Sequence, residues 1–279
     1  MTVVTRFAPS PTGLLHRGHA YAALFAAEAA RRAGGRFLLR IEDIDTGRCR
    51  PHFVAAILAD LAWLGLSWEE PVRQQSRHMD TYRAALARLD AAGVLYPCFC
   101  TRKDIAAEIA RAGAAPHGPD GPVYPGTCRG LTAAERARRL ARGDSHALRL
   151  DVARALALTG ALRWRDRAAG EIAVDTALLG DVVLARKEMP ASYHLAVTVD
   201  DALQGVTLVT RGTDLFHATH VHRLLQALLD LPVPEWHHHA LLAGPDGERL
   251  AKRSGAPSLA ALREAGADPA ALRHELGFP

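Results

Sequence analysis

Two histidines near the amino terminus stand where an expected strand gives way to an expected helix. His16 and His19 form the sequence His-Arg-Gly-His, between an apolar segment over 3–8 and an alanine-rich segment over 18–33. Open α/β sheets bind ligands at the carboxyl ends of their strands, and a helix amino terminus attracts phosphate. Gly18 lets a flat ligand approach the backbone because it has no side chain. The pattern suits a phosphate site, although two histidines in a surface loop would look the same.

Two charged segments also follow expected strands. The run Arg-Ile-Glu-Asp-Ile-Asp over 40–45 carries acids that can bind a metal, orient an amino group or cap the following turn. A basic run, Arg-Leu-Ala-Lys-Arg over 249–253, can neutralise phosphate or be a solvated stretch of charge. Lys252 is one of only three lysines in a chain with 34 basic side chains, which indicates a need for a compact ammonium there.

Three of the four cysteines lie in one segment. Cys98 and Cys100 open it, and Cys128 closes it after a loop rich in glycine and proline. Without a signal-peptide pattern, such a cluster favours a metal over disulfides. Thiolates are good zinc ligands and a structural site takes four ligands, so Tyr124 or His117 is the candidate for the fourth position. The alternative is three unrelated buried cysteines.

Hydrophobic periodicity and turn residues predict the elements that would position these side chains. The expected strands and helices are as follows: strands over 3–8, 37–41, 147–152, 180–185, 206–210 and 237–242, and helices over 18–33, 51–64, 76–92, 133–142 and 215–229. Strand and helix alternate at first, which implies a parallel sheet with right-handed crossovers. The tract His237–His239 is assigned to the last strand and not to a metal site.

The alternation breaks at Tyr96 and returns near Tyr193. We therefore expect an α/β protein with an inserted α+β module. The expected segments are a first half of the α/β domain over 1–95, the inserted module over 96–190, the second half over 191–243, and a basic loop with a short helical tail over 244–279.

Composition places the chain among globular proteins. Its 279 residues are 49% hydrophobic, which is enough to form a large core and excludes a disordered chain. The sequence has no run of eighteen apolar residues and does not begin with the layout of a signal peptide, so we expect a cytoplasmic protein without a membrane partner. The net charge of +4 is compatible with a polyanionic partner but does not require one.

The histidine pair and the basic loop together resemble the HIGH and KMSKS signatures of class I aminoacyl-tRNA synthetases. Further motifs resemble the glutamyl branch of that family, and they occur in the right order over nearly the whole chain. They are Arg6-Phe-Ala-Pro-Ser-Pro-Thr-Gly, Arg40-Ile-Glu-Asp-Ile-Asp, Val199-Asp-Asp-Ala-Leu-Gln-Gly-Val and Arg211-Gly-Thr-Asp-Leu. The related glutaminyl enzymes carry Pro-Pro-Glu where this chain has Ala8-Pro9-Ser10.

This resemblance implies a class I synthetase Rossmann-like fold and ATP-dependent activation of L-glutamate to glutamyl-adenylate. It implies these site residues: Arg6 and Arg211 on the glutamate carboxylates, Ser10 and Tyr193 completing the pocket, Glu42 on the α-ammonium, and His16, Gly18, His19 and Lys252 on ATP with Mg²⁺. His16 and His19 would act on the α-phosphate, and Lys252 on the departing pyrophosphate. The basic loop departs from the family pattern because it lacks the first lysine and both serines.

The cysteine spacing resembles the zinc site of a short glutamyl branch, which implies one structural Zn²⁺ on Cys98, Cys100, Tyr124 and Cys128. Only 26 of the 279 residues follow Arg253, whereas full glutamyl-tRNA synthetases continue into an anticodon-binding domain. The chain therefore resembles the glutamyl-queuosine tRNA(Asp) synthetases. That family transfers glutamate to queuosine in the anticodon of tRNA(Asp), without tRNA being needed for activation. The alternatives are a truncated glutamyl-tRNA synthetase that charges a tRNA 3′ end and a non-catalytic zinc RNA-binding module.

Overall fold

The computed structural model describes residues 2–112, 117–118, 121–175, 180–186, 189–242 and 257–279. The strands are β1 (Val4–Phe7), β2 (Arg36–Ile41), β3 (Glu69–Gln74), β4 (Leu95–Cys98), β5 (His117–Gly118), β6 (Gly121–Pro122), β7 (Ala147–Leu150), β8 (Arg163–Asp166), β9 (Gly170–Ala173), β10 (Val183–Arg186), β11 (Leu208–Gly212) and β12 (Glu235–His239). The helices are α1 (Arg17–Arg32), α2 (Pro51–Trp63), α3 (Met79–Ala91), α4 (Arg102–Ala112), α5 (Ala133–Ala141), α6 (Val152–Thr159), α7 (Tyr193–Leu203), α8 (Ala218–Leu228), α9 (Leu259–Glu264) and α10 (Pro269–Glu275).

Two groups of strands lie side by side and form the main sheet, in which all pairs are parallel except β8 with β9. Strands β1, β2 and β3 pair in that order, and β11, β12, β8 and β9 form the second group. The groups meet at β1, because the Val4 carbonyl accepts a hydrogen bond of 3.0 Å from the Thr207 N–H just before β11. From β1 the chain proceeds to β2 on one side and returns much later to β11 on the other. Such a reversal of strand order is called the switch point of the sheet, and open α/β sheets bind ligands there.

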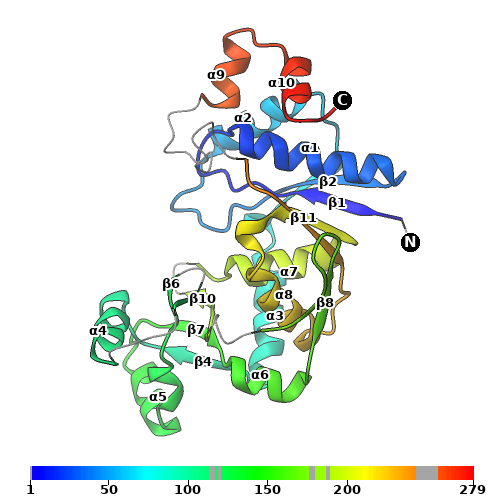
Figure 1. Ribbon diagram of the computed structural model, residues 1–279. Helices are drawn as coiled ribbons and strands as arrows, with labels where there is room; N and C mark the ends of the chain where they lie inside the picture. Colours follow the sequence, from blue (N-terminus) through cyan, green and yellow to red (C-terminus); the bar gives the residue numbers. More distant parts are fainter. Residues whose placement is uncertain (1, 113–116, 119–120, 176–179, 187–188, 243–256) are drawn as a thin grey trace.

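Helices cover both faces of this sheet (Figure 1). On one face α1 packs closely because small residues recur along its inner side; Ala20, Ala23, Ala26 and Ala30 are at most 2% exposed. The tail helices α9 and α10 add Leu259 and Leu272, one each, to the same apolar cluster as α2. On the other face α3, α7 and α8 share a second cluster. The carboxyl ends of β1 and β11 thus open between two packed layers.

The cysteine-containing module has its own antiparallel sheet, in the order β10, β7, β4. It lies beyond α7 and α3, with α4 and α5 on its outer side (Figure 1). Strands β8 and β9 also fall within the expected insertion over 96–190, yet β8 pairs in parallel with β12 through Asp166 and Trp236. Part of that segment therefore belongs to the main sheet, since the buried Trp164 packs among its side chains.

The elements predicted from periodicity are confirmed, and their bounds differ by only a few residues. The sequence did not indicate β3, which is an exposed edge strand with the polar sequence Glu-Glu-Pro-Val-Arg-Gln. Its residues have little tendency to form a strand, and the strand is stabilised by its parallel pairing with β2. Within the described residues, no helix combines the length and apolar character needed to cross a membrane.

Candidate active site

The two histidines cap the first helix in a reciprocal arrangement. The N–H of Gly18 donates to Nδ1 of His16 at 3.1 Å, and the N–H of His16 donates to Nδ1 of His19 at 3.2 Å. Their ring centroids are 3.8 Å apart. Because Nδ1 accepts in both rings, the proton of each neutral imidazole lies on Nε2. The helix amino terminus therefore carries two ring N–H donors of the kind that bind phosphoryl oxygens.

A buried network of charges lies behind β1 and β2. Asp201 accepts hydrogen bonds from Arg6 Nε at 2.9 Å and from Arg40 Nη1 at 2.8 Å. Arg40 also donates to Glu42 at 3.1 Å. Burial raises the pKa of Glu42, and Arg40 and Arg6 act in the opposite direction. Burial opposes ionisation of Asp201 too, yet the charges of Arg6 and Arg40 lower its pKa. The two arginines thus hold Asp201 and Glu42 in one buried network, in which the pKa of Asp201 is lowered and that of Glu42 is raised by burial.

Arg211 extends from β11 into a pocket of neutral acceptors. Its Nε donates to His238 Nε2 at 3.1 Å, and its Nη1 donates to the Tyr193 hydroxyl and to His222 Nδ1, both at 3.2 Å. Its Nη2 donates to the Thr219 hydroxyl. Arg211 is only 6% exposed, and burial lowers its pKa. No carboxylate of the described part of the chain forms an ion pair with it, so this buried guanidinium keeps its charge for a ligand.

Four of the five residues predicted to bind glutamate meet in one place. Arg6 donates to the carbonyl of Thr210, the residue before Arg211, at 3.1 Å. Arg6, Arg211 and Glu42 all act on the ionisation of Tyr193, which begins α7. Ser10 is exposed in the loop after β1, where the adjacent Pro9 carbonyl accepts the Glu42 N–H at 3.1 Å.

The basic loop lies outside the described residues, and this includes Lys252 and both neighbouring arginines. The described chain stops at residue 242 before this loop and resumes at residue 257. Before it, β12 ends at His239. After it, Leu259 N–H donates to the carbonyl of Leu15 at 2.8 Å, next to the first histidine of the capped helix. The described chain that follows this loop is therefore held at the residue next to His16, at the expected phosphate site.

Four donor atoms of the module converge as a zinc site requires. The thiols of Cys98, Cys100 and Cys128 all lie within 4.8 Å of one another. The Tyr124 oxygen is 3.3 Å from the sulfur of Cys98 and 3.7 Å from that of Cys100. A tetrahedral Zn²⁺ at ordinary bond lengths separates its ligand atoms by about 3.5–3.8 Å. The donor set fits zinc, whereas the side chain of His117 is not among those described.

We expect purified protein to carry about one zinc per chain, as a closed four-ligand site does, measurable by plasma mass spectrometry. Cys100→Ser should lose the metal and lower the melting temperature. It should still activate glutamate within a few-fold, because the cysteines lie in the module and not at the switch point. Metal-free parent protein would contradict the zinc site, and a folded Cys100→Ser variant without activation would contradict a purely structural role.

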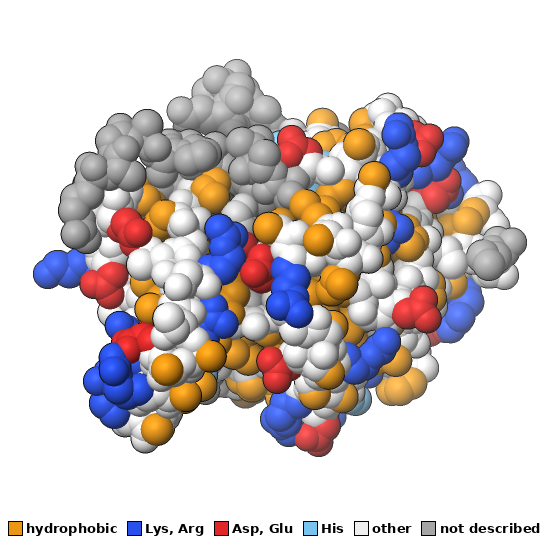
Figure 2. Space-filling view, turned by 90° about the horizontal axis from the view of Figure 1, so that it is seen from below, with side chains coloured by type: hydrophobic (Ala, Val, Ile, Leu, Met, Phe, Trp, Pro, Cys, Tyr) orange, Lys and Arg blue, Asp and Glu red, His pale blue; other side chains and the backbone are white. Residues whose placement is uncertain are grey.

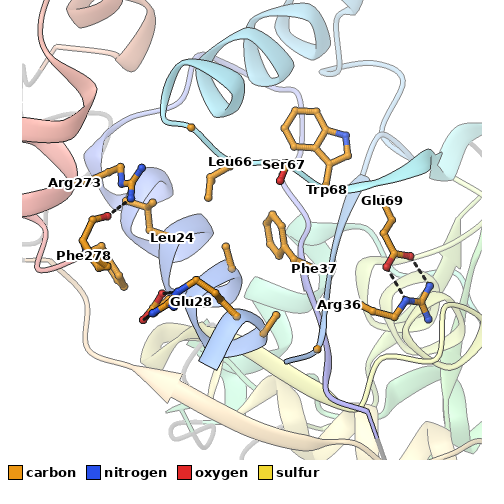
Figure 3. A pocket seen from close by; sticks show the side chains of 16 residues that line it. Leu24, Glu28, Arg36, Phe37, Leu66, Ser67, Trp68, Glu69, Arg273 and Phe278 are labelled. Atoms are coloured by element: carbon orange, nitrogen blue, oxygen red, sulfur yellow. Dashed lines mark hydrogen bonds and ion pairs between the residues drawn. The ribbon is translucent and has the colours of Figure 1, made fainter. Parts of the chain in front are cut away.

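A separate hollow of about 490 Å³ lies at the opposite end of β2. Figure 3 shows its wall, with Phe37 and Trp68 opposite Leu24, and with the Arg36–Glu69 ion pair at one side. No residue assigned above to glutamate, ATP or zinc lines this hollow. The candidate site is therefore defined by the convergence of charged side chains and not by this cavity.

Several residues that complete the site were not singled out from the sequence. Arg40 and Asp201 lie within the quoted motifs, and their occurrence beside predicted site residues in the sequence is the signal that could have identified them. Thr219 and His222 carry no local signal, because helical residues that face an arginine look like ordinary core residues.

Known proteins resemble the chain over nearly its whole length. Residues 2–277 match the family model described as tRNA synthetases class I (E and Q), catalytic domain. The chain is 51% identical to Glutamyl-Q tRNA(Asp) synthetase of Rhodobacter capsulatus, with 99% of this chain and 100% of that protein covered. It is 47% identical to the protein of the same name from Symbiobacterium thermophilum, with 98% and 85% covered.

Among solved structures, a glutamate tRNA ligase from Elizabethkingia meningosepticum, in complex with its amino acid, superposes with a TM-score of 0.83 at 28% identity. The match covers 99% of this chain and 60% of the ligase, so the chain spans about three fifths of that structure. The likeness supports the α/β fold with its parallel sheet.

Proposed function

The chain belongs to the class I tRNA synthetases of the glutamate and glutamine group, in the glutamyl-Q tRNA(Asp) synthetase branch, and on this premise we propose that it activates L-glutamate with ATP and transfers it to queuosine in the anticodon of tRNA(Asp). The observation that carries the proposal is the buried Arg211 guanidinium at the switch point. It has neutral partners only among the described residues, and a substrate carboxylate supplies the missing counter-charge.

The four predicted residues that meet at this site have roles in glutamate binding that suit their surroundings. Arg6 and Arg211 approach from neighbouring strands and bind carboxylates, for which a planar guanidinium is well shaped. Arg6 shares its charge with Asp201, so Arg211, which has no acid partner among the described residues, supplies the main counter-charge. Glu42 is held ionisable by Arg40 and binds the α-ammonium. Tyr193 and Ser10 complete the pocket by hydrogen bonding.

The reaction requires little covalent chemistry from the protein. A glutamate carboxylate oxygen attacks the α-phosphorus of ATP, the bond to the bridging oxygen breaks, and pyrophosphate leaves with the electron pair. His16, Gly18 and His19 hold the α-phosphate at the amino end of α1, and Lys252 neutralises the departing pyrophosphate. Class I synthetases use ATP with Mg²⁺, which shares the phosphate charge. Catalysis then consists of positioning and electrostatic stabilisation.

The module supplies a surface for RNA. Arginine and acidic side chains alternate on the face seen in Figure 2, and α5 illustrates this with Arg139 paired to Glu135 at 2.8 Å. Paired arginines release fewer counterions on binding a phosphate backbone, so we expect only a moderate salt dependence of tRNA binding. Recognition of a single-stranded anticodon loop agrees with such a surface, because loops are read through bases as well as phosphates.

ATP–pyrophosphate exchange tests the activation step. We expect exchange with L-glutamate in the absence of tRNA, and none with glutamine or aspartate. Glutamine lacks the side-chain charge that Arg211 binds, and the side chain of aspartate is one carbon too short to reach it. Equal exchange with glutamine would contradict the carboxylate assignment. An absolute requirement for tRNA would contradict the assignment to the glutamyl-Q branch.

A further inference from the structure

The three consecutive histidines of β12 point to opposite faces of the sheet. His237 and His239 lie against Phe25 of α1, with ring centroids 4.8 and 5.0 Å apart. His238 points the other way, toward Arg211, because successive side chains of a strand alternate. The tract is thus two packing residues and one residue at the candidate site.

His238 bridges a buried acid and Arg211. Its Nδ1 lies 2.7 Å from Asp166, and its Nε2 accepts from Arg211 Nε at 3.1 Å. Asp166 in turn is fixed by backbone N–H groups of His238, Ala168 and Ala169, at 3.0, 2.8 and 2.9 Å. Asp166 is 1% exposed and His238 is 5% exposed, so water does not replace these contacts.

These contacts determine which ring nitrogen of His238 carries the proton. Arg211 has no acceptor atom, so Nε2 must present its lone pair to it. The proton therefore lies on Nδ1 and is donated to Asp166. Burial, together with the Arg211 charge, lowers the pKa of His238 to about 4, so the ring is neutral at pH 7. Burial opposes the ionisation of Asp166, yet the hydrogen bonds from His238 and the backbone lower its pKa, and Asp166 stays ionised.

We propose that Asp166 and His238 are positioning residues of the glutamate site, which orient the Arg211 guanidinium through a neutral ring and leave its charge to the substrate carboxylate. An acid in direct contact with Arg211 would form a competing ion pair and oppose binding of the substrate. The ring between them passes on the orientation set by Asp166 without cancelling the charge. This inference rests on the proposed function, since it takes Arg211 as the group that binds the substrate carboxylate.

Kinetics of three variants test the positioning role. His238→Leu removes the acceptor and should raise the KM for glutamate in exchange by about 5- to 100-fold, the factor for a buried donor left without a partner. The KM for ATP should stay within two-fold of the parent value, whereas a general structural defect would raise both KM values. His238→Gln keeps an acceptor and should lie closer to the parent. His237→Leu, on the same strand but the opposite face, is the control and should match the parent.

The tautomer provides a readout that does not depend on activity. Long-range ¹⁵N–¹H spectra of the parent, with the His238→Gln variant to assign the signal, should show Nδ1 protonated and Nε2 unprotonated at pH 7. A proton on Nε2, or a glutamate KM within two-fold of the parent in a folded His238→Leu variant, would overturn the proposal. If the parent shows the expected tautomer but no glutamate-dependent exchange, the proposed function fails while the Asp166–His238 bridge stands.

Discussion

Replacing Arg211 with methionine will reduce kcat/KM for glutamate activation by about 30- to 1000-fold, the range for removing one partner of a desolvated, hydrogen-bonded charge pair. The expectation follows from burial. Arg211 is 6% exposed and is held by Tyr193, Thr219, His222 and His238, so no water or flexible side chain can take its place. Lysine at this position should not restore activity, because an ammonium cannot reproduce the planar set of hydrogen bonds.

Arg36→Met is the matched control for this prediction. Arg36 lies at the other end of the sheet in an exposed ion pair with Glu69, and such pairs contribute little. It should leave exchange within two-fold of the parent. If Arg211→Met retains parental activity while folded, as judged by circular dichroism, the carboxylate site lies elsewhere.

Lys252→Ala will slow adenylate formation about 100-fold or more, within the range for losing one electrostatic donor to the transition state. Negative charge accumulates on the leaving pyrophosphate, and a compact ammonium on a flexible stem can follow it. Lys252 lies outside the described residues, but the chain that follows its segment is held beside His16 by the hydrogen bond from the Leu259 N–H to the Leu15 carbonyl. The effect should appear mainly in kcat.

Arg249→Ala is the comparison that makes this prediction sharp. Arg249 is a neighbouring cation in the same segment, and its loss should cost only a few-fold because solvent cations can replace part of its charge. Exchange rates measured on both variants decide the matter. A larger loss with Arg249→Ala would mean that another residue of the altered KMSKS-like motif has this role and that Lys252 is not the pyrophosphate ligand.

Local chemistry explains what could be predicted from the sequence. The junction of β1 and α1 follows from a short apolar run, a turn of prolines and a glycine, and a long alanine-rich segment. The cysteine cluster follows from the spacing of Cys98, Cys100 and Cys128, whose sulfur atoms converge, and the Tyr124 oxygen lies beside them as the resemblance implies. The carboxylate-binding roles of Arg6 and Arg211 came only from family resemblance and remain predictions, since an isolated arginine after a strand has many uses.

Long-range contacts explain what could not be predicted. Asp166 and His238 are 72 residues apart and meet only because β8 joins the main sheet next to β12. The sequence of β8, Arg-Trp-Arg-Asp, is too short and too charged to indicate a strand of the main sheet. The acid that orients the site therefore comes from a segment that the sequence pattern assigns wholly to the inserted module.

Position mapping of the transferred amino acid tests the central claim most directly. The protein is incubated with ATP, radiolabelled glutamate and queuosine-containing tRNA(Asp), and the labelled nucleotide is identified after nuclease digestion. We expect the label on the queuosine nucleotide of the anticodon, and no labelling of tRNA(Asp) that lacks queuosine. Label on the 3′-terminal adenosine would instead show a glutamyl-tRNA synthetase, and would contradict the proposed transfer to the modified base.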